Sequence, residues 1–483
     1  MAIVFALAAL AIVPAPQKIF VSDGAFTTNL TVTYARDAKI PAEGYRLKVM
    51  ADGIMVWSSD DAGRFYAEMT LKQLDDAGRC PIVEIEDAPR FAWRGVHIDD
   101  CRHFFGKETV KKTMDLMAQH KLNVLHWHLT DDQGWRLDVP KHPELAKYGS
   151  VRSQSVRRHR DVAVKDDKNK FNGVTYGPYY YTEADIKEIL DYAAVRYIKV
   201  VPEIELPGHV QAALAAHPEF ACRPENVSNR DPRISWGVSE DVLCVGNDDA
   251  IKLFEDVFDY VCRLFPSDVV HIGGDECPQV RWKTCPKCQA RIKAEGLKDE
   301  HGLQPWLTRH FVKFLEAHGK RTIGWDEYLL GDVPPSAIGM RWRVGGGGAG
   351  HKCLSPKEMA EKGHDIVMTP FSHCYLDYAQ GIEDDPYMYL GTGVTLEKSY
   401  SFDPCAEVPE NLRPRVLGGQ GNNWAEFTWN EHDLMWKMWP RMCALAEVFW
   451  TGENRPGFAD FKQRMQTHRK RLIAQHVNCA PIE

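Results

Sequence analysis

The stretch VVHIGGDE, residues 269–276, decides the fold. It starts with β-branched residues, reaches two glycines at Gly273 and Gly274, and ends on two adjacent carboxylates, Asp275 and Glu276. A short apolar run of β-branched residues that ends at glycines is typical of a strand. Neighbouring carboxylates repel each other, so their place at the end of a strand raises the question of what they do there.

The same order of apolar strand, polar loop and amphipathic helix recurs through the rest of the chain. Eight strands that alternate with helices predict a parallel sheet, and at this number the natural arrangement is a closed (β/α)8 TIM barrel. The candidate strands are residues 95–100, 123–130, 199–206, 269–276, 321–327, 337–343, 365–372 and 416–424. The candidate helices are residues 107–120, 182–197, 249–265, 303–319 and 432–450.

The residues before this pattern predict a second, smaller domain. Short strands are expected at residues 45–50 and 54–57, and apolar residues at helical spacing predict a helix over residues 62–74. The fold class is therefore α/β, with a small and shortened α+β domain over residues 1–88 and the catalytic barrel over residues 89–483.

Composition excludes several classes of protein. The 483 residues are 44% hydrophobic and 26% charged, as in soluble globular proteins. With 59 Lys and Arg against 67 Asp and Glu, the net charge is −8 and no basic run follows a phosphate backbone, so no nucleic-acid partner is expected. No later segment is apolar for about 18 residues, so no membrane span is expected either.

The opening residues 1–16 allow two interpretations. They have the apolar length of a signal-peptide core but lack the basic residues expected before one, so a buried first strand is the favoured interpretation. A secreted or periplasmic location is the expectation that goes with the signal-peptide interpretation.

Carboxylates and aromatic residues gather at or just beyond the carboxyl ends of the predicted strands. Barrel enzymes build their active sites on this face. Tryptophan faces cover the apolar faces of pyranose rings, while carboxyl groups protonate leaving oxygens, so this set indicates a sugar-cleaving site. The residues are Asp99, His128, Asp131, Glu205, Asp275, Glu276, Trp325, Asp326, Trp342, Tyr375, Asp377, Trp424 and Glu426.

The two adjacent carboxylates, Asp275 and Glu276, require chemical roles that differ from those of an ordinary glycosidase pair. Successive strand residues point to opposite faces, so Asp275 and Glu276 cannot both flank a glycosidic bond unless the strand end is irregular. A substrate with its own nucleophile, such as a 2-acetamido carbonyl, removes this difficulty. Glu276 would then be the general acid, and Asp275 would hold the acetamide N–H and stabilise the developing positive charge.

Seven motifs in order resemble one family of glycosidases. They are FAWRGVHIDDCRHF, NVLHWHLTDDQGWR, EIELPGH, HIGGDE, GWDE, YLD and GNNWAE, and together they cover nearly the whole chain. They closely resemble the glycoside hydrolase family 20 β-N-acetylhexosaminidases. The resemblance implies an exo-acting, retaining enzyme that removes terminal β-GlcNAc or β-GalNAc from oligosaccharides or glycoconjugates by substrate-assisted catalysis through an oxazolinium intermediate.

The resemblance also implies roles for individual residues. Glu276 corresponds to the general acid and base, Asp275 to the residue that orients the acetamido group, and Tyr375 to the hydroxyl that holds its carbonyl oxygen. Asp131 and His209 would lie behind Glu276 and tune its pKa. The residues expected to bind the sugar are Arg94, Trp325, Trp342, Asp377, Trp424 and Glu426. No cofactor is implied, and the chain would act as a monomer or homodimer.

The sequence departs from the pattern of the family at two points, and two other functions are alternatives to the one that the resemblance implies. Position 205 is Glu where many relatives have Asp, and the N-terminal domain is short enough to depend on packing against the barrel. A metal-dependent hydrolase would use His126 and His128, with His209 and His271. A barrel that only binds sugar is the second alternative. The preference between GlcNAc and GalNAc cannot be read from these residues.

The cysteines could form a zinc site, disulfides or free thiols. Cys277, Cys285 and Cys288 form C-x7-C-x2-C, for which a zinc half-site ranks behind a local disulfide or plain thiols. Cys222 and Cys244 bracket a loop rich in Pro, Asn and Asp, and a disulfide between them is expected.

Overall fold

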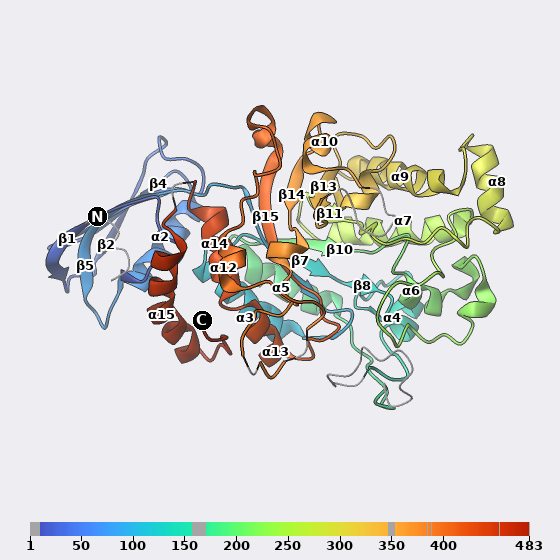
Figure 1. Ribbon diagram of the computed structural model, residues 1–483, viewed down its shortest axis with the longest axis horizontal. Coiled ribbons are helices and arrows are strands. Elements are labelled where there is room, and N and C mark those ends of the chain that lie inside the picture. The colour runs from blue at the N-terminus through green and yellow to red at the C-terminus, as the bar shows by residue number, and fades with distance from the viewer. Residues whose placement is uncertain are drawn as a thin grey trace.

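The computed structural model describes residues 10–156, 171–345, 353–383, 385–387, 389–453 and 455–482. It contains a closed parallel barrel of eight strands, which confirms the predicted fold (Figure 1). The strands are β6 (Trp93–Asp99), β7 (Val124–His128), β10 (Lys199–Glu203), β11 (Val269–His271), β12 (Arg321–Trp325), β13 (Ile338–Arg341), β14 (Ile366–Met368) and β15 (Val416–Asn423). Each falls within or overlaps a predicted strand.

The register of the strands brings polar residues to one level of the barrel. Asp99 pairs with His128, His128 with Glu203, and Glu203 with His271. All four are the last residues of their strands. Because the strands are parallel, these ends lie on one face, which is where the predicted site residues follow.

The helices follow the predicted amphipathic segments. They include α3 (Lys107–Gln119), α5 (Glu183–Ala194), α7 (Asp248–Leu264) and α9 (Leu303–Ala317). In α7, Ile251, Phe254, Phe258 and Val261 are buried at helical spacing, and the Asn247 side chain caps the helix by accepting from the Asp249 N–H.

One predicted helix is divided in two. Residues 432–450 form α13 (Glu431–Met438) and α14 (Arg441–Trp450), which are separated at Trp439 and Pro440. Proline has no N–H to donate and clashes with the preceding turn, so a continuous helix cannot pass through this position. A further helix, α15 (Phe458–Ala474), lies outside the predicted segments.

The small domain is a five-stranded sheet covered by α2 (Asp61–Leu74). The sheet has the order β1-β5-β3-β4-β2, and all but one of its pairings are antiparallel. Its strands are β1 (Lys18–Thr27), β2 (Val32–Arg36), β3 (Tyr45–Met50), β4 (Gly53–Ser58) and β5 (Cys80–Asp87).

The first strand begins later than expected. Residues 1–9 lie outside the described part of the chain, and residues 11–16 are buried in a turn rather than in a strand. The prediction of a strand here is therefore wrong for residues 11–16, which pack into the interior without pairing with the sheet. Gln73 accepts from the Val13 N–H and donates to its carbonyl, which satisfies this buried backbone.

The small domain shares its core with the barrel. Trp450 of α14 is fully buried within the hydrophobic cluster of the small domain, with its ring 5.1 Å from that of Tyr66. The Trp450 indole N–H donates to Asp87 at 2.9 Å, and Lys121 forms an ion pair with the same carboxylate at 2.8 Å. These contacts support the expectation that the small domain depends on the barrel.

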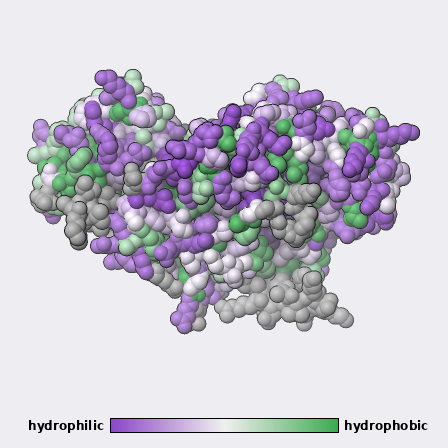
Figure 2. Space-filling model, turned by 45° about the horizontal axis from the view of Figure 1, so that its top comes forward, coloured by the Kyte–Doolittle hydropathy of each residue, from purple (hydrophilic) through white to green (hydrophobic). Residues whose placement is uncertain are grey.

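Hydrophobic residues on the face drawn in Figure 2 lie in small groups among hydrophilic ones. This distribution is typical of a surface that faces water. Within the described residues, we find no helix that combines the length and apolar character needed to cross a bilayer.

Candidate active site

The end of β11 is irregular, and this irregularity answers the question of the paired carboxylates. Gly273, Gly274 and Glu276 all have positive φ, at 64°, 96° and 43°. The chain therefore turns sharply, and both side chains face the same partner: His209 Nε2 lies 3.7 Å from Asp275 Oδ2 and 3.6 Å from Glu276 Oε2. Alternation along a regular strand would have separated the two carboxylates.

Glycine is required at position 273 for a second reason. A Cβ there would lie 2.0 Å from the carboxylate oxygens of Glu205, which occupy that space. One of these oxygens accepts from the Gly274 N–H at 2.9 Å. The longer reach of Glu at position 205 thus places its carboxyl group directly beneath the turn that carries Asp275.

His209 links the carboxylate pair to Asp131 and Asp132. Its Nδ1 lies 3.5 Å from Asp131 Oδ1 and 3.3 Å from Asp132 Oδ2. Although burial disfavours a charged imidazole, the Asp131 carboxylate raises the pKa of His209 well above its usual range. These distances are those of ion pairs rather than of strong hydrogen bonds. A charged His209 thus offsets the repulsion between Asp275 and Glu276.

The charges in this group set the ionisation of the pair. The neighbouring His209 lowers the pKa of Glu276, which favours its ionised form. Burial raises the pKa of Asp275, and burial together with the charge of Asp275 raises the pKa of Glu205 well above its usual range. These shifts favour the neutral form of Glu205 more strongly than that of Asp275.

Four aromatic rings form a continuous wall next to the carboxylates. Trp342 stacks on Tyr375 with ring centroids 6.1 Å apart and planes 13° apart. Trp424 lies 6.3 Å from Tyr375 and 5.5 Å from Trp325. The Trp342 indole N–H donates to Glu327 at 3.0 Å, which orients this ring. The structure therefore brings all four predicted aromatic residues together.

Two further carboxylates, those of Asp377 and Glu426, lie near Trp424. Asp377 Oδ1 accepts from the Trp424 N–H at 3.4 Å, while Asp377 Oδ2 and Glu426 Oε2 are buried and have no hydrogen-bond partner among the residues that the structure describes. Burial and the nearby Glu426 raise the pKa of Asp377 to about 7. Buried acceptors without partners carry a cost, so these atoms are suited to bind hydroxyl donors of a ligand.

Arg94 does not lie in this site, which contradicts the role predicted for it. It is the second residue of β6, at the opposite end of the barrel, and it is fully buried. Its guanidinium pairs with Glu43 and donates to the Tyr66 hydroxyl at 3.2 Å, both in the small domain. At about 3.3 Å per residue, the five steps from Arg94 to Asp99 separate it from the site by roughly 17 Å.

Arg102 occupies the position expected for Arg94. It follows β6 at the carboxyl end, donates to Asp99 at 3.2 Å and to Gln133 at 3.0 Å, and pairs with Asp131 at 2.9 Å. Its guanidinium carbon lies 5.0 Å from the centre of the Trp424 ring. A signal for Arg102 was present in the sequence, because it lies three residues beyond Asp99 at a strand end, whereas Arg94 begins the strand.

The histidines of the metal-hydrolase alternative do not share one centre. His126 and His271 contact the Glu203 carboxylate at 2.9 and 3.0 Å, and His128 contacts it as well. The fourth, His209, lies beside Asp275 and Glu276 instead. The Trp325 indole N–H donates to Glu203 at 2.8 Å. Glu203 and these histidines therefore form a buried support beneath Trp325.

A cavity of about 990 Å³ opens beside Glu276. Its lining includes Gln279, Glu300, His301, Arg309 and Glu327, so it is bordered mainly by the segments that follow β11 and β12. None of the four aromatic wall residues lines it, but Glu327, which accepts from the Trp342 indole, does. A group attached to a sugar held by the wall could extend into this space.

Two family models match the chain. The catalytic-domain model of glycosyl hydrolase family 20 matches residues 91–453, and the model of domain 2 of the same family matches residues 27–88. The chain belongs to glycosyl hydrolase family 20. This membership confirms the predicted family and the assignment as a glycoside hydrolase.

Individual relatives agree with the family 20 assignment. A β-hexosaminidase of Porphyromonas gingivalis is 40% identical over 449 residues, which are 90% of this chain and 54% of the relative. The chain thus spans about half of the length of that protein. A β-hexosaminidase of Akkermansia muciniphila is 33% identical over 477 residues, covering 97% of this chain and 91% of the relative.

Solved family 20 structures share the fold. The crystal structure of a β-N-acetylhexosaminidase superposes with a TM-score of 0.85 at 30% identity and covers 96% of this chain and 95% of its own. The exo β-N-acetylglucosaminidase of Vibrio harveyi, solved in complex with N-acetylglucosamine, has a TM-score of 0.85 at 28% identity. The match covers 98% of this chain and 78% of the Vibrio harveyi chain.

Proposed function

We propose that this family 20 chain is an exo-acting, retaining β-N-acetylhexosaminidase that removes terminal β-linked N-acetylhexosamine from oligosaccharides or glycoconjugates. One observation carries the proposal: Asp275 and Glu276 both lie near His209 Nε2, beside the aromatic wall. Two ordinary glycosidase carboxylates would lie across the scissile bond instead. Adjacent carboxylates fit a reaction in which the substrate supplies its own nucleophile.

In the first step, Glu276 donates a proton to the glycosidic oxygen as the bond from this oxygen to C1 breaks. The acetamido carbonyl oxygen attacks C1 from the opposite face and closes an oxazolinium ring. Asp275 accepts a hydrogen bond from the acetamido N–H and stabilises its developing positive charge, while the Tyr375 hydroxyl donates to the attacking carbonyl oxygen.

In the second step, Glu276 acts as a base. It takes a proton from a water molecule that attacks C1, and the oxazolinium ring opens to return the acetamido group. Two inversions at C1 give overall retention. The lowered pKa of Glu276 beside His209 favours its base form, and covering the site with sugar removes water and moves this pKa upward for the acid step.

The remaining site residues hold the terminal sugar. We assign Arg102, Asp377 and Glu426 to the outer hydroxyls, since each of the two carboxylates has a buried oxygen to which no described residue donates. Trp424 and Trp325 would lie under the sugar ring, and Trp342 with Tyr375 would enclose the acetamido methyl. The cavity beyond Glu276 would receive the leaving group.

Paired nitrophenyl glycosides test this proposal. The β-GlcNAc glycoside should be hydrolysed, and the β-glucoside, which lacks only the acetamido group, should release no nitrophenol above background. The first sugar product seen by NMR should be the β-anomer. Comparable cleavage of both glycosides, or an α-anomer as the first product, would overturn the substrate-assisted mechanism. Binding of a GlcNAc oligosaccharide without any product would favour the sugar-binding alternative.

A further inference from the structure

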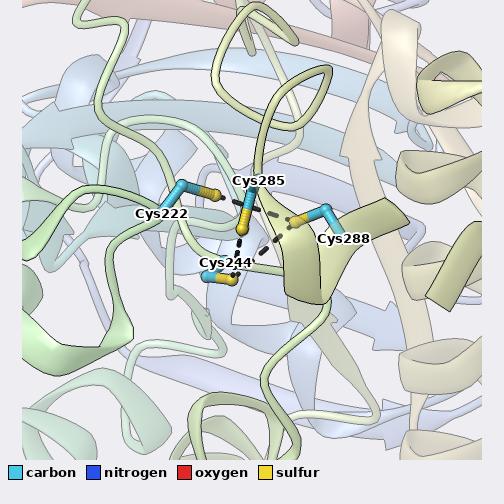
Figure 3. Close-up of side chains that lie close together, drawn as sticks. All are labelled: Cys222, Cys244, Cys285 and Cys288. Atoms are coloured by element: carbon cyan, nitrogen blue, oxygen red, sulfur yellow. Dashed lines mark hydrogen bonds between the residues drawn. The ribbon is translucent and has the colours of Figure 1, made fainter. Parts of the chain in front are cut away.

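Four cysteine side chains converge at one point outside the active site. Cys222 and Cys244 come from the long segment between β10 and α7, while Cys285 and Cys288 begin α8 (Pro286–Ala294) (Figure 3). The described cysteines are all free thiols, so the expected disulfide between Cys222 and Cys244 is not formed. Cys277, which the sequence pattern grouped with Cys285, is not a member of the cluster.

The spacing of the sulfurs indicates a shared ligand. Cys244 Sγ lies 3.6 Å from that of Cys285 and 3.7 Å from that of Cys288, and Cys222 Sγ lies 3.7 Å from that of Cys288. All four sulfurs lie within 4.8 Å of one another. A disulfide would bring one pair to about 2.05 Å, but no pair is singled out in this way.

A tetrahedral metal centre accounts for these distances. Zinc thiolate bonds of about 2.3 Å in a regular tetrahedron place the sulfurs about 3.8 Å apart, close to the distances observed here. We propose that Cys222, Cys244, Cys285 and Cys288 bind one structural Zn²⁺ ion. Four protein ligands would close its coordination shell, so the ion has no open position for a substrate.

The backbone around the cluster favours this assignment. Cys285 is the N-cap residue of α8 and Cys288 lies in its first turn, where the helix dipole and free N–H groups stabilise thiolates. Gly246 lies so close to the start of this helix that a Cβ would stand 2.1 Å from the Lys287 carbonyl carbon. The two segments therefore meet at backbone distance, which a shared ion would hold.

The zinc ion would fasten the catalytic turn to its neighbour. Cys285 follows Glu276 by nine residues, and Cys222 follows His209 by thirteen. Between the two segments, the Trp282 indole N–H donates to the Leu243 carbonyl at 2.9 Å and Arg281 pairs with Asp241 at 2.9 Å. The ion adds a covalent crosslink to these contacts, and so helps to keep His209 beside Asp275 and Glu276.

Metal analysis of the wild-type protein is the first test. Protein purified without a histidine tag should contain one zinc ion per chain by plasma mass spectrometry. Titration of its thiols with a mercurial should release that zinc as the cluster thiols react. Cobalt incorporated in place of zinc should give the strong visible absorption of a tetrahedral thiolate site. None of these three measurements depends on the folding of a variant or on enzymatic activity.

A matched pair of variants assigns the ligands. Cys285→Ser with Cys288→Ser should abolish zinc binding, whereas Cys262→Ser, which changes a half-buried thiol outside the cluster, should retain it. The double variant should also melt at a lower temperature and show a lower kcat with little change in KM. If the double variant does not fold, Cys222→His provides the test instead. Histidine keeps a zinc ligand at this position, so the affinity of this variant for zinc should be lower than that of the wild type but not abolished.

Three outcomes would overturn the proposal. They are disulfides that join these cysteines under non-reducing mass spectrometry, stoichiometric iron in place of zinc, and zinc that persists in the double variant. Each is independent of the proposed hydrolysis, because an active enzyme without zinc would contradict only the metal site. A zinc-loaded protein that fails to cleave the β-GlcNAc glycoside would contradict only the proposed function.

Discussion

The guanidinium of Arg102 lies over the indole of Trp424, 5.0 Å from the ring centre, and joins the sugar platform to the carboxylates behind Glu276. Through Asp131, at 2.9 Å, the same arginine reaches the group that charges His209. One side chain thus contacts both the proposed sugar-binding surface and the electrostatic support of the acid. Arg94, in a motif of the same strand, contacts neither.

Replacing Arg102 and Arg94 in separate variants distinguishes a role in the site from a role in stability. Arg102→Ala should lower kcat/KM on the β-GlcNAc glycoside about 100-fold, since truncating one partner of a buried charge pair costs about 2–5 kcal/mol. Arg94→Ala should leave KM unchanged but lower the free energy of unfolding by about 3 kcal/mol, because it removes a fully buried guanidinium together with its partly buried ion pair with Glu43 and its buried hydrogen bond to Tyr66. Steady-state kinetics and denaturant unfolding measure the two effects. Reversed results would return the sugar contact to Arg94.

Neutralising Asp275 should affect turnover far more than neutralising Glu205. Asp275→Asn removes the charge that stabilises the acetamido group, so we expect kcat to fall by roughly 100- to 1,000-fold, as for loss of other preorganised electrostatic groups. Glu205→Gln should cause a much smaller loss, because burial and Asp275 raise the pKa of Glu205 and favour its neutral form, which glutamine resembles. Equal losses would show that Glu205 is ionised in the working enzyme.

Glu276→Gln should discriminate between leaving groups. Activated aryl glycosides need little protonation, so their bond cleavage should be reduced less than that of an unactivated GlcNAc disaccharide. The comparison requires kcat/KM for both substrates with the wild type and the variant. If the variant loses the same factor on both, Glu276 is not the general acid.

His209 makes stability depend on pH in a defined direction. Its folded-state pKa is raised above the unfolded value of about 6.5, so its stabilisation is complete below that pH. Above it, the folded state binds more protons than the unfolded state, and stability falls by up to about 1.4 kcal/mol per pH unit until the folded pKa is reached. The difference in unfolding free energy between wild type and His209→Gln should therefore shrink as pH rises from 6 to 8. A constant difference would mean that His209 is neutral.

Local patterns were sufficient to predict the fold. Each barrel strand is a short apolar segment that ends in polar residues, and this pattern is carried by consecutive residues such as 269–276. The helix predicted over residues 432–450 was wrong in one respect that a local rule explains, because Pro440 separates α13 from α14. The buried turn at residues 11–16 was not predictable in this way, because apolar residues without periodicity fit a strand and a packed turn equally.

The sequence by itself determined the barrel, the face on which its polar residues gather, and the kinds of side chain available for sugar chemistry. Tertiary structure alone decided which of these side chains meet. It turned Asp275 and Glu276 toward one histidine, placed Arg102 rather than Arg94 in the site, and brought Cys222 and Cys244 to Cys285 and Cys288. The physical reason is that strand and helix periods depend on neighbouring residues, whereas the paths of long loops depend on packing between segments far apart in the chain.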